Sequence, residues 1–286
     1  MTSTHRRPAA RRTPEPLPRL IATDLDGTLL RSDQTVSPRT VAALAAAEAA
    51  GVRVYFVTGR PARWMNVVSD HTARHGIAIC ANGAAIYDLH GDRLVGVRAL
   101  DPGDALAVVR ALRAELPEVT FAVEHTRGYC YEPDYPLLPD WTRPGAVSAP
   151  AETLLASDIG PVLKLLVRHP SLDPDGFLAM ARQAAGAHAE FTRSSSVALL
   201  EVSATGVSKA TTLAHCCSEL GIDASEVVAF GDMPNDLEML AWAGTSYAVA
   251  NAHPEVLAAT THHTASNDED GVARVIESLL ERRPAP

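Results

Sequence analysis

The chain has 286 residues, 47% hydrophobic and 21% charged, which is enough for one large domain or two smaller domains with a buried core. Its formal net charge of −9 argues against a general nucleic-acid-binding protein, because such a protein presents a basic face to the phosphate backbone. Aromatic residues make up only 5% of the chain, so we expect alanine-rich helices such as residues 41–51 to supply much of the packing.

The cysteines and the N-terminal residues give information about the cellular location of the protein. The four cysteines lack the CxxC spacing of a zinc site or a disulfide framework, so we expect reduced thiols in a cytoplasmic protein. No apolar run is long enough to span a bilayer. Residues 1–18 contain two Arg-Arg pairs but lack the apolar stretch of a signal peptide. Their composition predicts a disordered basic tail, and we favour a solvated tail over one that touches nucleic acid or a membrane surface.

Strands and helices alternate at both ends of the remaining chain. In chain order, the expected elements are a strand at 20–24, a helix at 37–51, strands at 52–60 and 76–84, a helix at 208–220, a strand at 226–232, a helix after 234, a strand at 246–250 and a helix at 271–283. This alternation predicts an α/β core of residues 19–84 and 201–286. We expect a Rossmann-like parallel sheet in it, with helices on both faces.

The middle of the chain, residues 85–200, has a different pattern. Helical stretches at 104–116 and 173–186 occur among several expected strands, including 120–124, and a Pro-rich loop follows at 130–146. Strands and helices no longer alternate regularly here. We therefore expect an α+β domain inserted into the core as a cap.

Polar side chains follow three strands of the expected core. Asp24 and Asp26 follow the first strand, Thr58 ends the second, and Asp232 ends the strand at 226–232. Because ligands of open α/β sheets bind at the carboxyl ends of the strands, these side chains should gather at one edge. Carboxylates suit magnesium, which keeps positions open for water and substrate phosphate. Lys209 lies at the start of a helix, where its charge and the helix dipole both favour a phosphate group, so the set predicts phosphoryl transfer.

Four segments also carry a resemblance to a known family. DLDGTLL, VTGRP, GVSKA and GDMPNDLEML occur in the order and spacing of the haloacid dehalogenase superfamily. More narrowly, the chain resembles the Cof-type sugar phosphatases, in which a type IIB cap is inserted after the second motif. The likeness extends over residues 81–84, 251–256 and 266–280, and so covers about residues 20–280. The cap matches only by its position in the chain and by its mixture of expected helices and strands.

The resemblance implies a magnesium-dependent phosphatase that forms a covalent aspartyl-phosphate. It implies that Asp24 is the nucleophile and that Asp26 is the general acid and then the base that activates water. The magnesium ligands it implies come from the first and fourth motifs: Asp24, Asp26 through its backbone carbonyl, Asp232, and Asp236 near the metal-bound water. The phosphate-binding residues it implies come from all four: Leu25, Thr58, Gly59, Lys209 and Asn235.

Substrate choice should depend on the cap. Glu124, His125, Arg127 and Tyr129 lie on or beside an expected cap strand and are candidates for contacting the leaving group. Arg193, with the serines that follow it, is a second candidate. The sequence gives no placement of these side chains over the core.

The expected activity is therefore hydrolysis of a small phosphorylated metabolite. Sugar phosphates follow from the resemblance, while flavin-precursor phosphates, pyridoxal phosphate and glycerate-type esters stay open. Two other functions also stay open: a phosphomutase of the same fold, and a phosphate-binding regulatory module without turnover. We expect no nucleic-acid or membrane partner, and a monomer or weak homo-oligomer.

Overall fold

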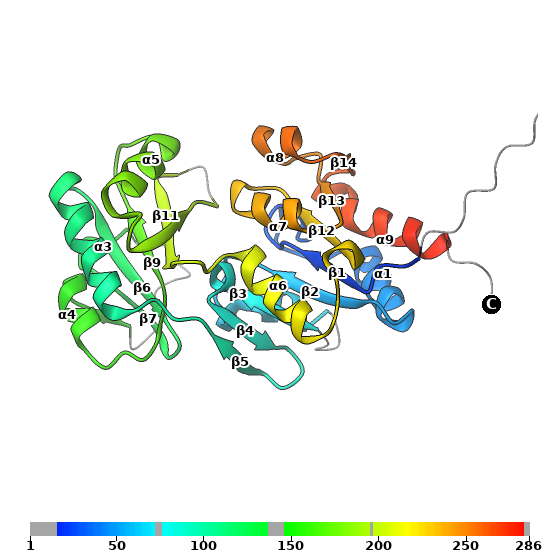
Figure 1. Cartoon of the computed structure of the whole chain (residues 1–286), viewed down its shortest axis with the longest axis horizontal. Helices are drawn as coiled ribbons and strands as arrows, with labels where there is room; N and C mark the ends of the chain where they lie inside the picture. The colour runs from blue at the N-terminus through cyan, green and yellow to red at the C-terminus, as the bar shows by residue number, and fades with distance from the viewer. Residues whose placement is uncertain (1–15, 72–75, 137–145, 195–196, 283–286) are drawn as a thin grey trace, which may run out of the picture.

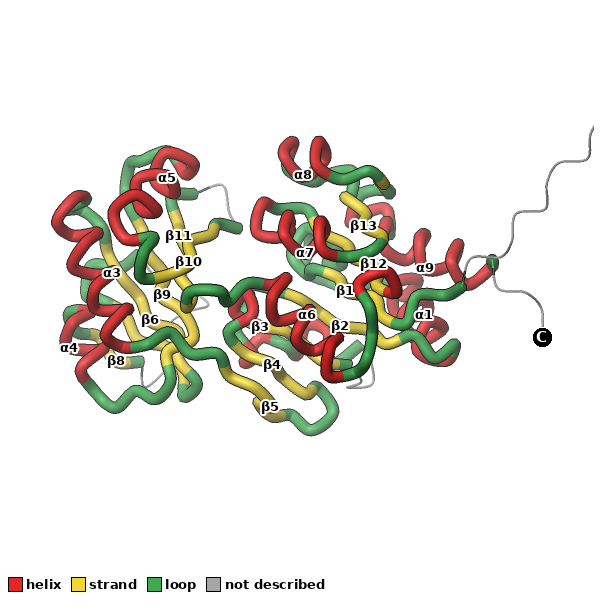
Figure 2. Tube along the Cα trace, in the orientation of Figure 1, coloured by secondary structure: helices red, strands yellow, loops and turns green. Residues whose placement is uncertain are grey.

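The computed structural model describes residues 16–71, 76–136, 146–194 and 197–282. Two β-sheets, each covered by helices, lie side by side, and loops connect them (Figures 1 and 2). Most of the expected tail at residues 1–18 falls outside the described residues.

The larger sheet forms the core of the molecule. Its strand order, among the described residues, is β14-β13-β12-β1-β2-β3-β4-β5. The six neighbouring parallel strands are β14 (His262–His263), β13 (Thr245–Ala248), β12 (Val227–Gly231), β1 (Leu20–Thr23), β2 (Arg53–Val57) and β3 (Ile77–Cys80). An antiparallel hairpin of β4 (Ala85–Asp88) and β5 (Arg93–Val97) extends the sheet at one edge. The expected Rossmann-like parallel sheet is thus confirmed, with this hairpin in addition.

Helices cover both faces of this sheet (Figure 1). They are α1 (Pro38–Ala49), α2 (Asn66–Ser69), α6 (Lys209–Glu219), α7 (Leu237–Trp242), α8 (Pro254–Ala259) and α9 (Gly271–Glu281). Successive residues of a strand point to opposite faces. Ile21 accordingly packs in one cluster with residues of α1 and α9, while Leu20 packs in another with residues of α6 and α7. Strands buried on both faces explain the nearly continuous apolar runs of the sequence.

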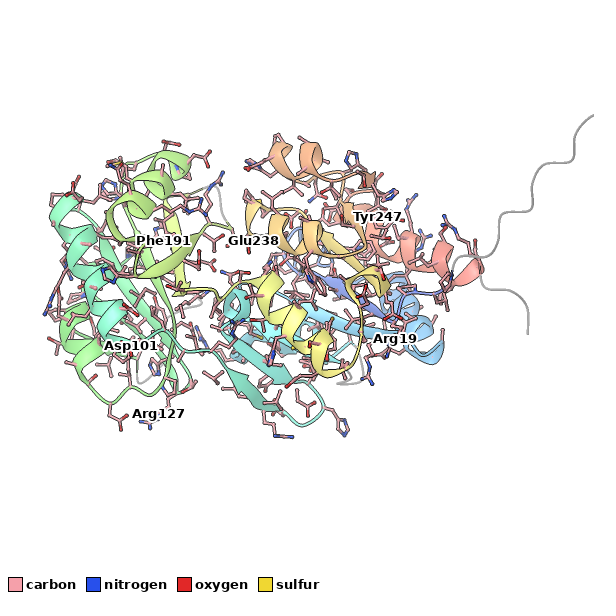
Figure 3. All side chains as sticks on the ribbon, in the orientation of Figure 1. Arg19, Asp101, Arg127, Phe191, Glu238 and Tyr247 are labelled. Atoms are coloured by element: carbon pink, nitrogen blue, oxygen red, sulfur yellow. The ribbon has the colours of Figure 1, made fainter. Side chains whose placement is uncertain are left out.

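The smaller sheet and its helices form the cap. The strand order is β10-β11-β9-β6-β7-β8, and all pairs are antiparallel except β7 with β8. The strands are β6 (Thr120–His125), β7 (Gly128–Tyr131), β8 (Val147–Ser148), β9 (Val162–Arg168), β10 (Ala189–Thr192) and β11 (Leu199–Ala204). The helices α3 (Pro102–Glu115), α4 (Ala151–Ala156) and α5 (Pro174–Ala185) lie on its outer side (Figure 1). Phe191 belongs to the apolar cluster between these layers, whereas Tyr247 packs against the core cluster (Figure 3).

The boundaries of the inserted domain differ from the expected division at residues 84 and 201. Strands β4 and β5 extend the core sheet, although residues 85–97 were expected in the cap. Strand β11 lies wholly in the cap sheet, although the core was expected to resume within it. The cause is strand pairing: a hairpin directly after β3 continues the sheet it leaves. That choice of partner has no local sequence signal.

Helix starts follow the local signals of the sequence. Ser37, Asp101 and Asp173 accept hydrogen bonds from backbone N–H groups in the first turns of α1, α3 and α5, and proline is the next residue in each case. Gly51, with φ of +85°, follows the end of α1 as expected. None of the helices in the described ranges is both long and apolar enough to cross a bilayer.

Candidate active site at the carboxyl ends of the core strands

Three buried carboxylates meet where β1 and β12 end. Asp24 directly follows β1 and Asp232 directly follows β12, and the two strands are parallel neighbours in which Thr23 is opposite Phe230. Asp236 belongs to the short 3₁₀ helix Pro234–Asp236 that follows. One oxygen from each of the three carboxylates lies within 4.8 Å of the others. The structure therefore brings Asp24 and Asp232 together at one edge, as the strand ends predict, and Asp236 joins them from the following turn.

Lys209 ties two of these carboxylates together. It is the first residue of α6, whose N-cap is Ser208. Its ammonium donates hydrogen bonds to Asp24 Oδ1 at 2.6 Å and to Asp236 Oδ1 at 2.7 Å. Lys209, Asp24 and Asp236 are all buried, so these are charge-assisted bonds in a low-dielectric setting. Lys209 fixes the orientation of Asp24 relative to the rest of the group.

The pKa values of two of these carboxylates reflect their burial first and the excess of negative charge second. Burial raises the pKa of Asp24 well above its usual value, partly offset by Lys209 and reinforced by Asp236 and Asp232. Burial and the charge of Asp236 raise the pKa of Asp232 to about 7. Burial alone would lower the pKa of Lys209, but Asp236 and Asp24 raise it, so its ammonium stays charged. Three carboxylates thus share one ammonium, and a second cation would stabilise the ionised group.

The donor set fits a small, hard cation. Asp236 is largely committed, because its Oδ2 accepts the N–H groups of Asp232 and Met233 at 3.1 Å and its Oδ1 accepts from Lys209. The carboxylates of Asp24 and Asp232 are left to supply the oxygen ligands that magnesium prefers. Asp232 is oriented by Thr28, whose hydroxyl donates to its Oδ1 at 2.7 Å.

Gly27 leaves the space in which Asp232 lies. The glycine has φ of +77°, and a Cβ atom added there would lie 2.4 Å from Asp232 Oδ2. Asn251 supports the same loop by donating a hydrogen bond to the Gly27 carbonyl at 2.7 Å. The DxDG pattern thus includes a glycine because the backbone must pass close to the second metal-ligand candidate.

Asp26 has a different environment from Asp24. Its side chain is 48% exposed and accepts two hydrogen bonds from Arg60, from Nε at 2.7 Å and from Nη2 at 2.5 Å. The two aspartates are separated by one residue but have different surroundings. Asp24 is buried and accepts a hydrogen bond from Lys209, whereas Asp26 is partly exposed and pairs with Arg60. Different surroundings allow two carboxylates to take different chemical roles.

A cavity of about 190 Å³ lies over this group and contains most of the expected phosphate-binding positions. Asp24, Asp26, Thr58, Gly59 and Asn235 line it. The other expected site residues are buried and are not among the described residues that line the cavity: Leu25, Lys209, Asp232 and Asp236. The Leu25 side chain packs in the core.

Asn235 has an unused acceptor at this cavity. Its amide donates to Asn82 Oδ1 at 3.2 Å, while its own Oδ1 is buried without a hydrogen-bond partner among the described residues. Asn82 belongs to the 3₁₀ helix Ala81–Gly83, which follows β3. A buried amide oxygen without a partner is costly, so this position is suited to a ligand or water.

The cap candidates separate into three groups. Glu124 reaches the 190 Å³ cavity, where it pairs with Arg63 of the core. His125, Arg127 and Tyr129 line an adjoining cavity instead. Arg193 is buried and pairs with Asp175 at 2.7 Å, and it is not among the described residues that line either cavity.

Sequence reasoning missed several residues that the structure places at the cavity. Arg60 and Arg63 follow the Thr58 turn, and Lys164 and Glu201 come from the cap strands β9 and β11. Lys164 Nζ donates to Glu201 Oε2 at 3.0 Å and to the carbonyl of Gly59 at 2.7 Å, so it bridges cap and core.

Two sequence signals could have identified Lys164. It is the one charge in the interior of an apolar strand that otherwise carries only the terminal Arg168, and an unpaired ammonium there would be expensive. It is also one of only two lysines in the chain, the other being Lys209.

Comparisons with known proteins identify the family of the chain. Residues 21–276 match the family described as haloacid dehalogenase-like hydrolase. The chain is 29% identical over 271 residues to the pyridoxal phosphate phosphatase YbhA of Escherichia coli, covering 92% of this chain and 98% of the relative. It is 30% identical over 275 residues to the 5-amino-6-(5-phospho-D-ribitylamino)uracil phosphatase YcsE of Bacillus subtilis, covering 90% and 94%. The solved structure of the HAD subclass IIB sugar phosphatase BT4131 superimposes with a TM-score of 0.76 at 22% identity, covering 91% of this chain and 98% of that one.

Proposed function

We propose, since the chain belongs to the haloacid dehalogenase-like hydrolases, that it is a magnesium-dependent phosphatase of small phosphomonoesters and acts through a covalent aspartyl-phosphate. The observation that carries this proposal is the contact of Lys209 with both Asp24 and Asp236 beneath the 190 Å³ cavity. Asp24 is thereby held at the cavity surface with one carboxylate oxygen fixed. The other oxygen is left for an incoming phosphorus atom.

In the first step, Asp24 is the nucleophile. One carboxylate oxygen forms a bond to phosphorus, and the bond from phosphorus to the ester oxygen of the leaving group breaks. The transferred group carries its charge on three oxygens. Thr58 lines the cavity with a hydroxyl that can donate a hydrogen bond to them, and Asn235 lines it with an amide NH2 group, whose second hydrogen can do the same. The buried ammonium of Lys209 lies behind Asp24.

Asp26 moves the proton in both steps. It first donates a proton to the ester oxygen, so that the leaving group departs as an alcohol. In the second step it takes a proton from water, whose oxygen attacks phosphorus and releases inorganic phosphate while Asp24 is regenerated. Asp26 is bound to Arg60 in this structure, so Arg60 must yield at least one hydrogen bond when the substrate oxygen arrives.

A bound magnesium ion would neutralise negative charge on the phosphoryl group and the carboxylates. Asp24, Asp232 and the backbone carbonyl of Asp26 are the residues proposed to hold it, with Asp236 orienting Lys209 and the backbone at Asp232. The raised pKa values of Asp24 and Asp232 support this assignment, because a cation would relieve the repulsion that burial and neighbouring carboxylates create.

The substrate is proposed to be a small phosphorylated metabolite. The relatives named above act on pyridoxal phosphate and on a phosphorylated ribitylaminouracil, and both compounds are phosphomonoesters of a primary alcohol. The cap sheet faces the phosphate site and would cover the leaving group during the first step.

The decisive experiment measures phosphate release from a panel of phosphorylated metabolites by wild type and Asp24→Asn, with magnesium and with EDTA. We expect release from a few compounds with magnesium, at least a thousandfold less release in Asp24→Asn, and none with EDTA. Asp24→Asn keeps the shape of the side chain, and circular dichroism should show an unchanged fold. Arg39→Lys is a matched surface control, because Arg39 pairs with the exposed Glu277 far from the site.

Each other outcome favours a named alternative. Full activity of Asp24→Asn would refute the covalent mechanism. Undiminished release with EDTA would refute the metal requirement. Return of phosphate to a second position of the substrate would indicate a phosphomutase. No release from any ester, including an artificial aryl phosphate, would favour a binding module without turnover.

A further inference from the structure

The turn that follows β3 has an unusual backbone. Ala81, Asn82 and Gly83 have positive φ angles of +51°, +55° and +106°. Glycine and asparagine adopt this left-handed region readily, whereas alanine does so at a cost. Three such residues in a row persist only where the surrounding structure holds them in place.

The turn is held between two parts of the phosphate site. The N–H group of Asn82 donates a hydrogen bond to the carbonyl of Thr58 at 3.0 Å. A Cβ atom at Gly83 would lie 2.3 Å from the carbonyl oxygen of Ser208, the residue before Lys209. The backbone of the turn is thus packed between the loop of Thr58 and α6.

The side chain of Asn82 forms one hydrogen bond with the cap and one with the core. Its Nδ2 donates to Oε2 of Glu201, on cap strand β11, and its Oδ1 accepts from Nδ2 of Asn235 at 3.2 Å. Asn82 is buried and is not among the described residues that line the cavity over Asp24, whereas Asn235 is. An effect of Asn82 on a phosphate group in this cavity would therefore act through Asn235.

Glu201 determines which way the amide of Asn82 faces. Burial alone would raise the pKa of Glu201, but Lys164 and Ser194 lower it below its usual value, so the carboxylate is ionised and can only accept hydrogen bonds. It also accepts from Lys164 Nζ at 3.0 Å and from Ser194 Oγ at 2.6 Å. The NH2 group of Asn82 must therefore face Glu201, and its oxygen must face Asn235.

The same reasoning fixes the amide of Asn235. The oxygen of Asn82 has no hydrogen to donate, so the NH2 group of Asn235 has to face it. One hydrogen of that group bonds to Asn82, and the second can bond to a phosphate oxygen. An amide turned over would present its own oxygen, which repels an anionic phosphate. The order of donors and acceptors that starts at Glu201 thus decides whether Asn235 attracts phosphate.

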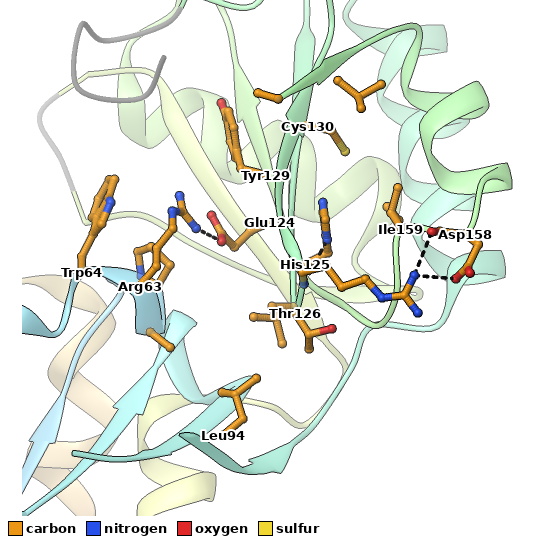
Figure 4. Close-up of a pocket in the computed structure, with 17 residues that line it drawn as sticks. Arg63, Trp64, Leu94, Glu124, His125, Thr126, Tyr129, Cys130, Asp158 and Ile159 are labelled. Carbon is orange, nitrogen blue, oxygen red and sulfur yellow. Dashed lines mark hydrogen bonds and ion pairs between the residues drawn. The ribbon is translucent and has the colours of Figure 1, made fainter. Parts of the chain in front are cut away.

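The contact between Glu201 and Asn82 crosses from the cap to the core. Arg63 of the core likewise donates a hydrogen bond to the buried carboxylate of Glu124 of the cap (Figure 4). Because Glu201 belongs to the cap sheet, it meets Asn82 only while the cap lies against the core. The fixed orientation of the Asn235 amide therefore requires the cap in this position.

We infer that Asn82 is a positioning residue for phosphoryl transfer, which turns the NH2 group of Asn235 toward the phosphate when Glu201 of the cap lies against it. The inference rests on the proposed phosphatase function. It adds a form of regulation to that site, because contact of the cap with the core sets a hydrogen-bond donor of the phosphate site.

The first test is a double-variant cycle. Values of kcat/KM for an artificial aryl phosphate, and the inhibition constant of inorganic phosphate, are measured for wild type, Asn82→Gly, Asn235→Ala and the double variant. Glycine adopts the φ of +55° readily, so Asn82→Gly removes the side chain without adding strain. Asp92→Gly is the matched control, because Asp92 has φ of +49°, loses one hydrogen bond, from Tyr87, and is not among the described residues that line the cavity.

We expect kcat/KM to fall about a hundredfold in Asn235→Ala and about tenfold in Asn82→Gly, and to stay unchanged in Asp92→Gly. In the Asn235→Ala background, Asn82→Gly should cause no further loss, because the residue that Asn82 positions is already absent. The inhibition constant of inorganic phosphate should follow the same pattern. A residue that only supports the fold would instead give an additive loss.

The second test exchanges the donor and the acceptor between cap and core. In Glu201→Gln, Lys164 takes the new amide oxygen, so the new NH2 group meets that of Asn82, and we expect a loss similar to that of Asn82→Gly. Asn82→Asp/Glu201→Gln should recover part of the activity. The new amide can then donate to the new carboxylate, which still accepts from Asn235. Far-UV circular dichroism and urea unfolding check that each variant folds.

The possible failures are distinguishable. No phosphate release by wild type would refute the proposed phosphatase function, and the inference with it. Release by wild type together with additive losses in the first cycle, or with full activity of Asn82→Gly, would overturn the inference alone. No recovery in folded Asn82→Asp/Glu201→Gln would overturn the role of Glu201.

Discussion

At the scale of single residues, Asp232 is the group whose titration should be easiest to observe. Its pKa in the folded, metal-free protein is raised to about 7, mainly by burial, whereas an aspartate in an unfolded chain titrates near ~3.9. Between about pH 4 and pH 7 the folded state therefore holds a proton that the unfolded state has lost. The free energy of unfolding should fall as the pH rises through this window, by up to about 1.4 kcal/mol per pH unit for this one proton.

Urea unfolding with EDTA at pH 5, 6, 7 and 8 measures this dependence. Asp232→Asn, which cannot titrate, should show a smaller slope, and magnesium should stabilise the wild type more at pH 8 than at pH 5. Stability of the metal-free protein that increases from pH 5 to pH 7 would contradict the prediction.

Residue types at the site were predictable where a motif constrains them, and less so elsewhere. Asp24 and Asp232 follow strands, and the edge of a parallel sheet brings such residues together whatever the loops do. The contacts of Asp26 were not predictable, because they depend on the direction in which the Arg60 side chain leaves the next loop. The same holds for Arg63, because nothing in the sequence shows that its side chain points toward Glu124 and not toward solvent.

At the scale of the element, the loop after β1 allows a sharp test through Gly27. Alanine at this position adds a Cβ atom 2.4 Å from Asp232 Oδ2 at a φ of +77°, so Asp232 must shift. We expect Gly27→Ala to lower the affinity for magnesium about 10- to 100-fold, the cost typical of disturbing a metal ligand's support. Titration calorimetry, or the magnesium dependence of kcat, measures the change.

Gly51→Ala is the matched control for backbone strain. Gly51 has a similar φ of +85°, but a Cβ atom there meets nothing within 4 Å. This variant carries the conformational penalty without the contact with Asp232, so its magnesium affinity should equal that of wild type. Equal affinities in both variants and wild type would show that the Gly27 contact does not matter.

Elements with local end signals were predictable, and elements defined by their partners were not. The proline that starts α1 and the cap residue before it are signals within the chain segment itself. The β4–β5 hairpin has no such signal for its sheet, and it was placed in the cap although it pairs with β3. Strand β11 was recognised as a strand, but its partners β9 and β10 decide that it belongs to the cap.

At the scale of the whole molecule, Lys164 should connect the cap to the core. Its buried ammonium links Glu201 of the cap sheet to the carbonyl of Gly59 beside the phosphate site. Lys164→Met should lower the free energy of unfolding by about 3–5 kcal/mol, because it leaves the carboxylate of Glu201 buried without its counter-ion. Glu201 has a pKa that Lys164 and Ser194 lower despite its burial, so it is ionised at pH 7 in the wild type.

A double-variant cycle checks the cause. Lys164→Met/Glu201→Gln should recover part of the lost stability, because the unpaired charge is then removed. Urea unfolding of the two single variants and the double variant gives the coupling energy. Additive effects would mean that the two side chains act independently.

The sequence by itself determined the family, the α/β core and the positions of the catalytic candidates, because motif residues lie at strand ends and the geometry of a parallel sheet places those ends together. Only the tertiary structure decided which side chains of the cap and the core form the walls of the cavity over these residues. Arg63 of the core contacts Glu124 of the cap, and Lys164 of the cap contacts the Gly59 carbonyl of the core. These contacts depend on how the cap sheet is set against the core. Local sequence patterns report the conformation of a segment, but a cavity between domains depends on packing between segments, so its walls became visible only in three dimensions.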